Sequence, residues 1–167
     1  SIKKSNADLD KEKDKVKYLK NDKRLKSMQE AYKRFGVDPE KRAPSSEALI
    51  KRLESGKGIY SINTLVDAYN LASVQESLPM AAYDMDKVSF PIELGAANGN
   101  ESITLIGGEN KKVKSGEMIY KDKERVLCLD FNYRDCDHTK ITEKTKDTII
   151  FVDGVQGISD EDLLNAL

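Results

Sequence analysis

The sequence has no tryptophan, only two cysteines and a single histidine among 167 residues. It also has no run of about 18 apolar residues, which a membrane-spanning helix needs, and no basic stretch followed by the short apolar segment of a secretory signal. We therefore expect a cytoplasmic protein that does not bind membranes. The chain begins at Ser1 rather than methionine, which leaves open whether an N-terminal piece has been removed.

The few cysteine and histidine residues do not suffice for a structural zinc site. Cys128, Cys136 and His138 fall within eleven positions, whereas such a site takes four ligands. Cys128 belongs to the apolar run 126–129 and is expected to be a buried strand residue, without a disulfide to Cys136 in a reducing compartment. His138 has no serine or cysteine placed to form a triad with it, and we interpret it as a surface residue. We predict neither a metal nor a cofactor.

Charge is nearly balanced overall, at −1, but it is unevenly distributed. Residues 1–60 contain 17 Lys and Arg against 10 Asp and Glu, and the remainder contains 11 against 19. A basic surface for a polyanion beside an acidic pocket would give this pattern. Charges that only keep helices solvated would give it too.

The first part of the chain has helical periodicity. Residues 8–35 are predicted to form one long helix, polar in its first half and ended by Gly36. A second helix, with a serine as N-cap, follows Pro44 and runs to about residue 54. A third is expected at 63–77, apolar on nearly every side and therefore largely buried. Ser159 is predicted to cap a last short helix.

The third helix also carries a polar stripe. Asn63, Asp67 and Asn70 are spaced at i, i+4 and i+7, which places them on one face. Polar groups on a buried helix need partners, and these are a ligand, water or other protein groups.

Strand patterns dominate from residue 88 onward, separated by Gly, Asn and Lys turns. Helices followed by strands indicate an α+β domain, which we place at residues 28–167, after a basic helical extension at 1–27. The expected strands are Val88–Leu94, Ile103–Ile106, Met118–Tyr120, Val126–Asp130 and Thr148–Val152.

The segment 131–140 concentrates polar chemistry between two strands, and such loops often carry sites. Asn132, Arg134, Asp135 and Asp137 are the candidate catalytic residues, because arginine holds anions and a carboxylate positions water. A solvated loop with internal salt bridges is the alternative.

Five segments in series carry a resemblance to a known family. They resemble the tRNA-editing (B3/4) domain of the phenylalanyl-tRNA synthetase β chain, in its freestanding form, over roughly residues 28–167. The segments are Arg42-Ala43-Pro44-Ser45-Ser46-Glu47-Ala48-Leu49, Asn63 to Leu71, Leu78-Pro79 with Tyr83 to Lys87, Leu105-Ile106-Gly107-Gly108-Glu109, and Asn132 to Asp135 through Thr139-Lys140-Ile141-Thr142.

The resemblance implies an α+β fold of three layers, PheT/TilS-like, with a β-sandwich of unusual topology and helices packed outside it. Freestanding relatives usually have strands ahead of the long helix. These strands are absent here, so either they are missing from this chain or the chain departs from the pattern.

For function, the resemblance implies the hydrolysis of a wrongly esterified amino acid on tRNA, in trans and by a positioned water. In the synthetase, such a domain removes tyrosine from phenylalanine tRNA. The synthetase motif Pro-Met-His-Ala reads Pro79-Met80-Ala81-Ala82 here, with Ala81 in place of the histidine. The alternative is a noncatalytic module that binds tRNA, an amino acid or a protein.

The expected partners are the aminoacylated acceptor end of tRNA and its amino-acid moiety, but not DNA. Acidic residues converging on the pocket would favour a polar or cationic side chain. If Arg134 and Lys140 neutralise these acids, an apolar cavity shaped by Val66, Tyr69 and Met80 remains. The predicted RNA contacts are Lys13, Lys17 and Lys20, and the predicted substrate-binding residues are Ser46, Asn63, Asp67, Asn70, Ala81, Gly107, Gly108, Glu109, Thr139 and Lys140.

Overall fold

The computed structural model describes residues 21–167. Lys13, Lys17 and Lys20, most of the 1–27 extension and the front of the expected long helix lie outside the described residues. No helix among the described residues is long and apolar enough to cross a membrane.

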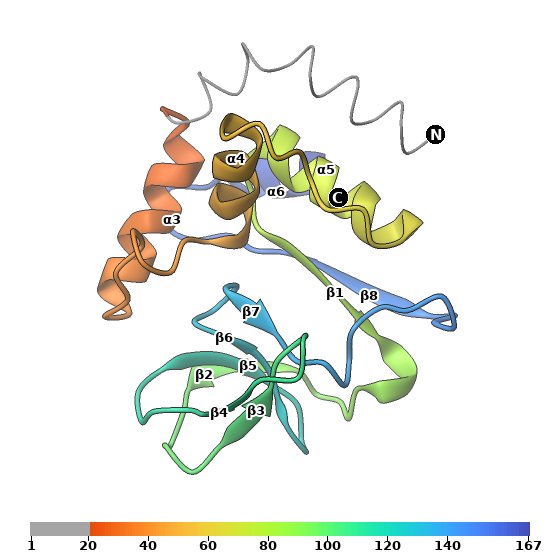
Figure 1. Cartoon of the computed structure of the whole chain (residues 1–167). Coiled ribbons are helices and arrows are strands. Elements are labelled where there is room, and N and C mark those ends of the chain that lie inside the picture. The colour runs from red at the N-terminus through yellow and green to blue at the C-terminus, as the bar shows by residue number, and fades with distance from the viewer. Residues whose placement is uncertain (1–20) are drawn as a thin grey trace.

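Four helices gather at one end of the described part of the molecule (Figure 1). Asn63 and Ser159 cap their helices as predicted, with the Asn63 side chain accepting a hydrogen bond from the Val66 amide. The predicted serine cap of the second helix is wrong, because Pro44 holds that position and no side chain caps the helix. The helices are α3 (Lys23–Arg34), α4 (Ser45–Glu54), α5 (Thr64–Glu76) and α6 (Asp160–Ala166).

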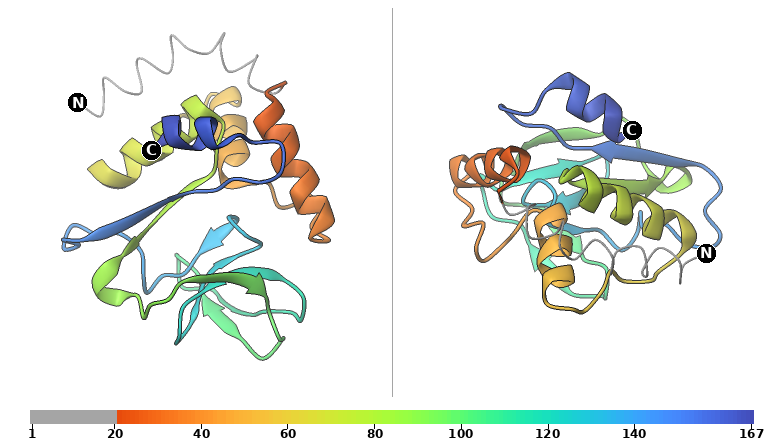
Figure 2. Two further views of the ribbon diagram at one scale, coloured as in Figure 1. Left: turned by 180° about the vertical axis from the view of Figure 1, so that it is seen from behind. Right: turned by 90° about the horizontal axis from the view of Figure 1, so that it is seen from above.

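The strands of residues 21–167 form three antiparallel sheets. The pair β1–β8 lies between the helices and the other two sheets, and Figure 2 shows the same layering from behind. One of these is four-stranded with the order β2-β5-β6-β7, and the other pairs β3 with β4. The strands are β1 (Met80–Asp84), β2 (Glu93–Ala96), β3 (Ser102–Thr104), β4 (Asn110–Lys112), β5 (Met118–Lys121), β6 (Val126–Leu129), β7 (Arg134–Asp135) and β8 (Thr148–Val152), with a 3-10 turn at Met85–Lys87.

The α+β class and most strands are as expected, and the strand at 148–152 has the predicted bounds. The strand expected at 88–94 begins only at Glu93, since Pro91 has no amide to donate to a ladder. The strand at 80–84 was missed, as were the short strands β4 and β7.

Separate clusters of buried side chains hold the layers together. One lies among the side chains of the four-stranded sheet and the β3–β4 pair and includes Cys136, which is 4% exposed although its sequence neighbours are polar. Another joins α5 to β1 through Val66, Ala82 and Ile141. Only three α5 residues are buried, Val66, Ser73 and Val74, so the expectation of a largely buried helix is wrong. Part of its remaining surface lines a cleft.

Candidate functional site

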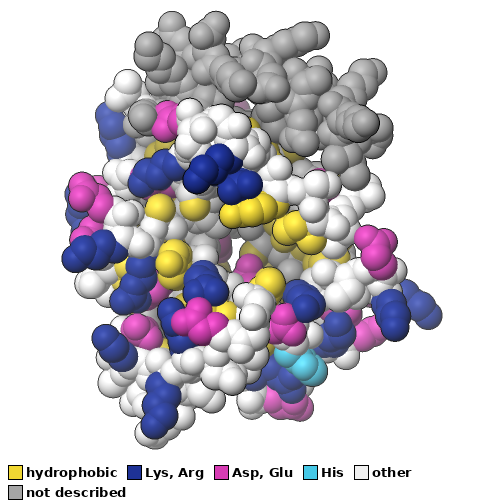
Figure 3. Space-filling view, viewed as in Figure 1, with side chains coloured by type: hydrophobic (Ala, Val, Ile, Leu, Met, Phe, Trp, Pro, Cys, Tyr) yellow, Lys and Arg dark blue, Asp and Glu magenta, His cyan; other side chains and the backbone are white. Residues whose placement is uncertain are grey.

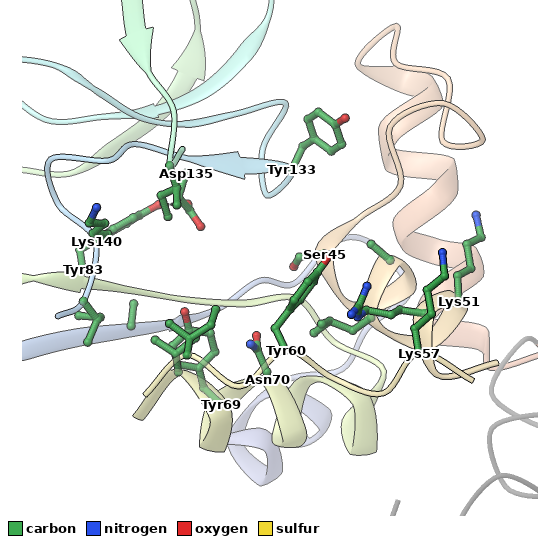
Figure 4. A pocket seen from close by; sticks show the side chains of 18 of the residues that line it. Ser45, Lys51, Lys57, Tyr60, Tyr69, Asn70, Tyr83, Tyr133, Asp135 and Lys140 are labelled. Carbon is green, nitrogen blue, oxygen red and sulfur yellow. Dashed lines mark hydrogen bonds between the residues drawn. The ribbon is translucent and has the colours of Figure 1, made fainter. Parts of the chain in front are cut away.

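A cleft of about 630 Å³ lies between the helices and the sheets, within the size range of small-molecule sites. Figure 3 shows a hollow on this face, bordered by hydrophobic side chains with basic side chains gathered above it. Figure 4 shows the lining side chains from close by. They come mainly from α4, the loop after it, α5, β1 and the segment 133–141: Ser45, Ala48, Leu49, Lys51, Arg52, Ser55, Lys57, Tyr60, Ile62, Val66, Tyr69, Asn70, Ala82, Tyr83, Ile106, Tyr133, Asp135, Lys140 and Ile141.

Asp135 is the one acidic residue among those that line the cleft in the described structure. Tyr83 donates its hydroxyl hydrogen to Oδ1 of Asp135 at 3.3 Å. Burial raises the pKa of Asp135 above its ordinary value, while hydrogen bonds from the Cys128 thiol and the Tyr83 hydroxyl act in the opposite direction. The net effect is a raised pKa, and a carboxyl group with a raised pKa in a cleft is a candidate for proton transfer.

A second, smaller cavity of about 30 Å³ adjoins the cleft and shares Ser45, Tyr83, Tyr133 and Asp135 with it. Its volume is close to that of one water molecule. Asp153 lines this cavity, and burial raises the pKa of its carboxyl to about 6, partly offset by hydrogen bonds from Tyr120 and Asn132. The Tyr120 hydroxyl donates to Oδ1 of Asp153 at 2.6 Å.

The two thiols and the histidine are not among the residues that line the cleft in the described structure. Cys128 is buried and lines only the smaller cavity, and burial raises the pKa of its thiol, which keeps it protonated and a poor nucleophile. His138 is exposed, and its backbone amide donates to Sγ of Cys136. Within residues 21–167, no group of three or more His, Cys, Asp or Glu side chains could hold a metal ion. The cleft chemistry therefore centres on a carboxyl group and hydroxyls.

Of the four candidate catalytic residues, Asp135 alone lines the cleft. Asn132 is buried, and its Oδ1 accepts a 2.6 Å hydrogen bond from the Tyr32 hydroxyl. Arg134 donates to Glu109 at 2.8 Å. Lys140 donates to Asp137 at 2.7 Å, which leaves Lys140 on the cleft wall as half of an ion pair.

The three residues of the polar stripe on α5 have different roles. Oδ1 of Asn63 caps the helix, and Asp67 accepts hydrogen bonds from the Ile62 amide at 2.8 Å and the Ser61 hydroxyl at 3.2 Å. Only Asn70 lines the cleft. Two of the three polar residues thus stabilise the start of the helix.

The other predicted substrate-binding residues are scattered. Ser46 and Thr139 are fully buried, and their hydroxyls have no hydrogen-bond partner in the described part of the chain, while Ser45 reaches the cleft. Ala81 lines the smaller cavity. Gly107 and Gly108 form an exposed turn with positive φ angles, 99° and 86°, which leads to the exposed Glu109. Asn70, Asp135 and Lys140 are therefore the predicted residues that the fold brings together.

Sequence reasoning missed much of the cleft wall. Lys57 and Tyr60 line it, with Arg52 over the Tyr60 ring, and Tyr133 and Tyr83 line it too, the latter with its hydroxyl on Asp135. The sequence does contain a signal for Lys57 and Tyr60. Gly56 and Gly58 indicate a loop between two helices, and a loop that contains a lysine and a tyrosine is a candidate binding segment.

Comparison with known proteins places this architecture in a family. The profile of the B3/4 domain matches residues 27–162, which is most of the chain. The chain belongs to the B3/4 domain family. Among solved structures, an N-terminal fragment of the phenylalanyl-tRNA synthetase beta subunit from Pyrococcus horikoshii is similar, with a TM-score of 0.51, 20% identity, and coverage of 65% of this chain and 39% of that one. This likeness concerns the fold.

Curated relatives of this B3/4 domain protein are beta subunits of phenylalanine–tRNA ligases. The one from Haemophilus ducreyi is 32% identical over 93 residues, 56% of this chain and 12% of the relative. The one from Fusobacterium nucleatum is 35% identical over 72 residues, 43% of this chain and 9% of the relative. The chain thus spans only a small part of the length of these relatives.

Proposed function

We propose that this protein hydrolyses the ester bond of a mischarged aminoacyl-tRNA. One observation carries the proposal: a B3/4 domain forms a cleft with Asp135 on its wall, hydrogen-bonded to Tyr83 and with a raised pKa. The relatives are named as parts of a tRNA ligase, which supports tRNA as the carrier of the substrate.

In the proposed reaction, Asp135 acts as the general base. Its carboxylate takes a proton from a water molecule, and the water oxygen forms a bond to the ester carbonyl carbon. The bond from this carbon to the ribose oxygen then breaks, and the proton returns to the leaving ribose hydroxyl. The products are the free amino acid and uncharged tRNA.

An aminoacyl ester is already activated, so positioning and electrostatic stabilisation can supply most of the catalysis. The Asn70 amide and the Lys140 ammonium group line the same cleft and are the candidate donors for the developing oxyanion. Ser45 has a buried hydroxyl that bonds to no other group of the described residues, and it lines both cavities, where it can hold the attacking water.

A family histidine is not required in this scheme. Ala81, at the corresponding position, faces the smaller cavity, whereas the proposed base comes from β7. A noncatalytic binding module would bind the same ligand in the cleft but would not release the amino acid.

The experiment is a deacylation assay of the chain with a panel of mischarged tRNAs. The proposal expects faster release of at least one amino acid than in buffer alone, and a loss of about 10²- to 10⁴-fold in Asp135→Asn, as for removal of a general base. Binding without acceleration for every member of the panel would favour the noncatalytic module instead.

A further inference from the structure

One end of the cleft differs chemically from the end that holds Asp135. Arg52 lies over the ring of Tyr60, with Cζ 3.7 Å from the ring centroid. Tyr60 nevertheless remains 55% exposed, so much of its surface is open to solvent. Both residues line the cleft, together with the exposed Lys57.

The cations at this end are only partly used within the protein. Nε of Arg52 is buried and has no hydrogen-bond partner among residues 21–167. Lys57 makes no ion pair with any residue of the described part of the chain, whereas Lys51 pairs with Glu47 at 2.7 Å. A buried donor without a partner and an unpaired ammonium group are suited to an anionic ligand.

We propose that Arg52, Lys57 and Tyr60 bind the single-stranded 3′ end of an RNA, with phosphates on the two cations and a base stacked on the tyrosine. A phosphate alone would not explain the exposed aromatic ring between the cations and the cleft interior. Single-stranded nucleic acids are bound in this way, by a positively charged groove combined with aromatic stacking platforms. The inference rests on the proposed function for the nature of the RNA, an aminoacylated tRNA end.

The two ends of the cleft then fix the direction of the ligand. Figure 4 shows Lys51 and Lys57 on one side and Asp135, Tyr83 and Lys140 on the other, with Tyr60, Asn70 and Tyr69 between them. A phosphate is repelled by the carboxylate of Asp135 and attracted by Lys57. The nucleotide therefore occupies the α4 end, which leaves the esterified amino acid at the Asp135 end.

The test measures binding of a 5′-phosphorylated CCA trinucleotide to the full chain by calorimetry. Loss of base stacking should weaken binding of Tyr60→Leu about tenfold, and Lys57→Gln should bind more weakly with a smaller salt dependence. Phe90→Leu and Lys123→Gln are matched controls, because both residues are exposed and lie outside the cleft. Both controls should bind like the wild type.

Equal binding by Tyr60→Leu, Lys57→Gln and the wild type would overturn the inference, as would no CCA binding by the wild type. Inorganic phosphate serves as a second probe, and equal affinity for phosphate and CCA would exclude the stacking platform. If the proposed function is wrong but this site is correct, the experiments give a different result. If CCA binding depends on Tyr60 but no aminoacyl-tRNA is hydrolysed, this site stands and the deacylase proposal falls.

Discussion

The Tyr83 hydroxyl donates to Oδ1 of Asp135 at 3.3 Å and thereby joins the β1–β8 pair to the four-stranded sheet at the cleft. The two residues are 52 positions apart. The hydrogen bond stabilises the ionised form of Asp135, while burial disfavours it. The balance between them sets the pH at which Asp135 becomes a base.

Tyr83→Phe removes this hydrogen bond, so the pKa of Asp135 should rise further. If Asp135 is the base, the rise of the deacylation rate with pH should shift to higher pH, and the rate below the midpoint should fall several-fold. The pH–rate profile measures the shift. Tyr133→Phe is the matched control, since Tyr133 lines the same cleft without a hydrogen bond to Asp135 among the described contacts, and its midpoint should stay in place.

The sequence predicted a polar or cationic substrate side chain, because acidic residues were expected to converge on the pocket. In the structure, ion pairs near the cleft neutralise two of these acids, which favours a neutral substrate side chain. Glu109 is paired with Arg134, and Asp137 with Lys140. Aromatic and aliphatic side chains, including Val66 and Tyr69, line the cleft, while Met80 lines only the smaller cavity. Phenylalanyl or tyrosyl esters should therefore be hydrolysed about tenfold or more faster than arginyl esters. Deacylation rates on the matching tRNAs compare them, and an arginyl preference would restore the acidic-pocket hypothesis.

The pKa of Asp153, about 6 in the folded protein against an ordinary 3.8, predicts a pH dependence of stability. Between about pH 4 and pH 6 the folded protein retains a proton that the unfolded chain has released. The raised pKa thus stabilises the fold at low pH, and this contribution is lost as the pH rises through the folded pKa.

Asp153→Asn should remove this decline while keeping an acceptor for the Tyr120 hydroxyl. Urea unfolding at pH 4, 5, 6 and 7 measures the difference in unfolding free energy between variant and wild type. That difference should move in favour of the variant as the pH rises. A difference that stays constant across the four pH values would contradict the assignment.

An ion pair ties the segment before α4 to the turn ahead of the site. Arg42 contacts Oδ2 of Asp130 at 2.6 Å, and the Asp130 side chain is 2% exposed. Because Arg42→Gln would leave a buried carboxylate unpaired, with Arg42 itself partly solvated, we expect a loss of about 2 kcal/mol in unfolding free energy. Urea denaturation tests this value. Lys41→Gln, in an exposed pair with Asp38, should change the unfolding free energy by less than about 0.5 kcal/mol.

The sequence predicted those elements whose signals are local. Asn63 and Ser159 marked helix starts through their capping chemistry, and residues 148–152 form the predicted strand. The strand at 80–84 was missed because its pairing with 148–152 lies more than sixty residues away in the chain. Such pairing depends on tertiary structure, which a window of sequence does not contain.

The site residues also depend on tertiary contacts that the sequence alone does not show. Asn63 and Asp67 share a helix face with Asn70, as their spacing predicted, but Asn63 accepts from the Val66 amide in the first turn of the helix and Asp67 from the Ile62 amide before it. Their polarity alone did not separate capping from ligand binding. The Arg134–Glu109 pair spans 25 residues, and only the fold showed that these two charges pair with each other outside the cleft.

The central claim is that this cleft removes an amino acid from tRNA with Asp135 as the base. The most direct measurement is the single-turnover deacylation rate of wild type, Asp135→Asn and Asp147→Asn on the best substrate from the mischarged panel. Asp147 is exposed, does not line the cleft and is the matched acidic control. The account predicts a loss of about 10²-fold or more for Asp135→Asn and near wild-type rates for Asp147→Asn. Equal rates for the wild type and Asp135→Asn would contradict it.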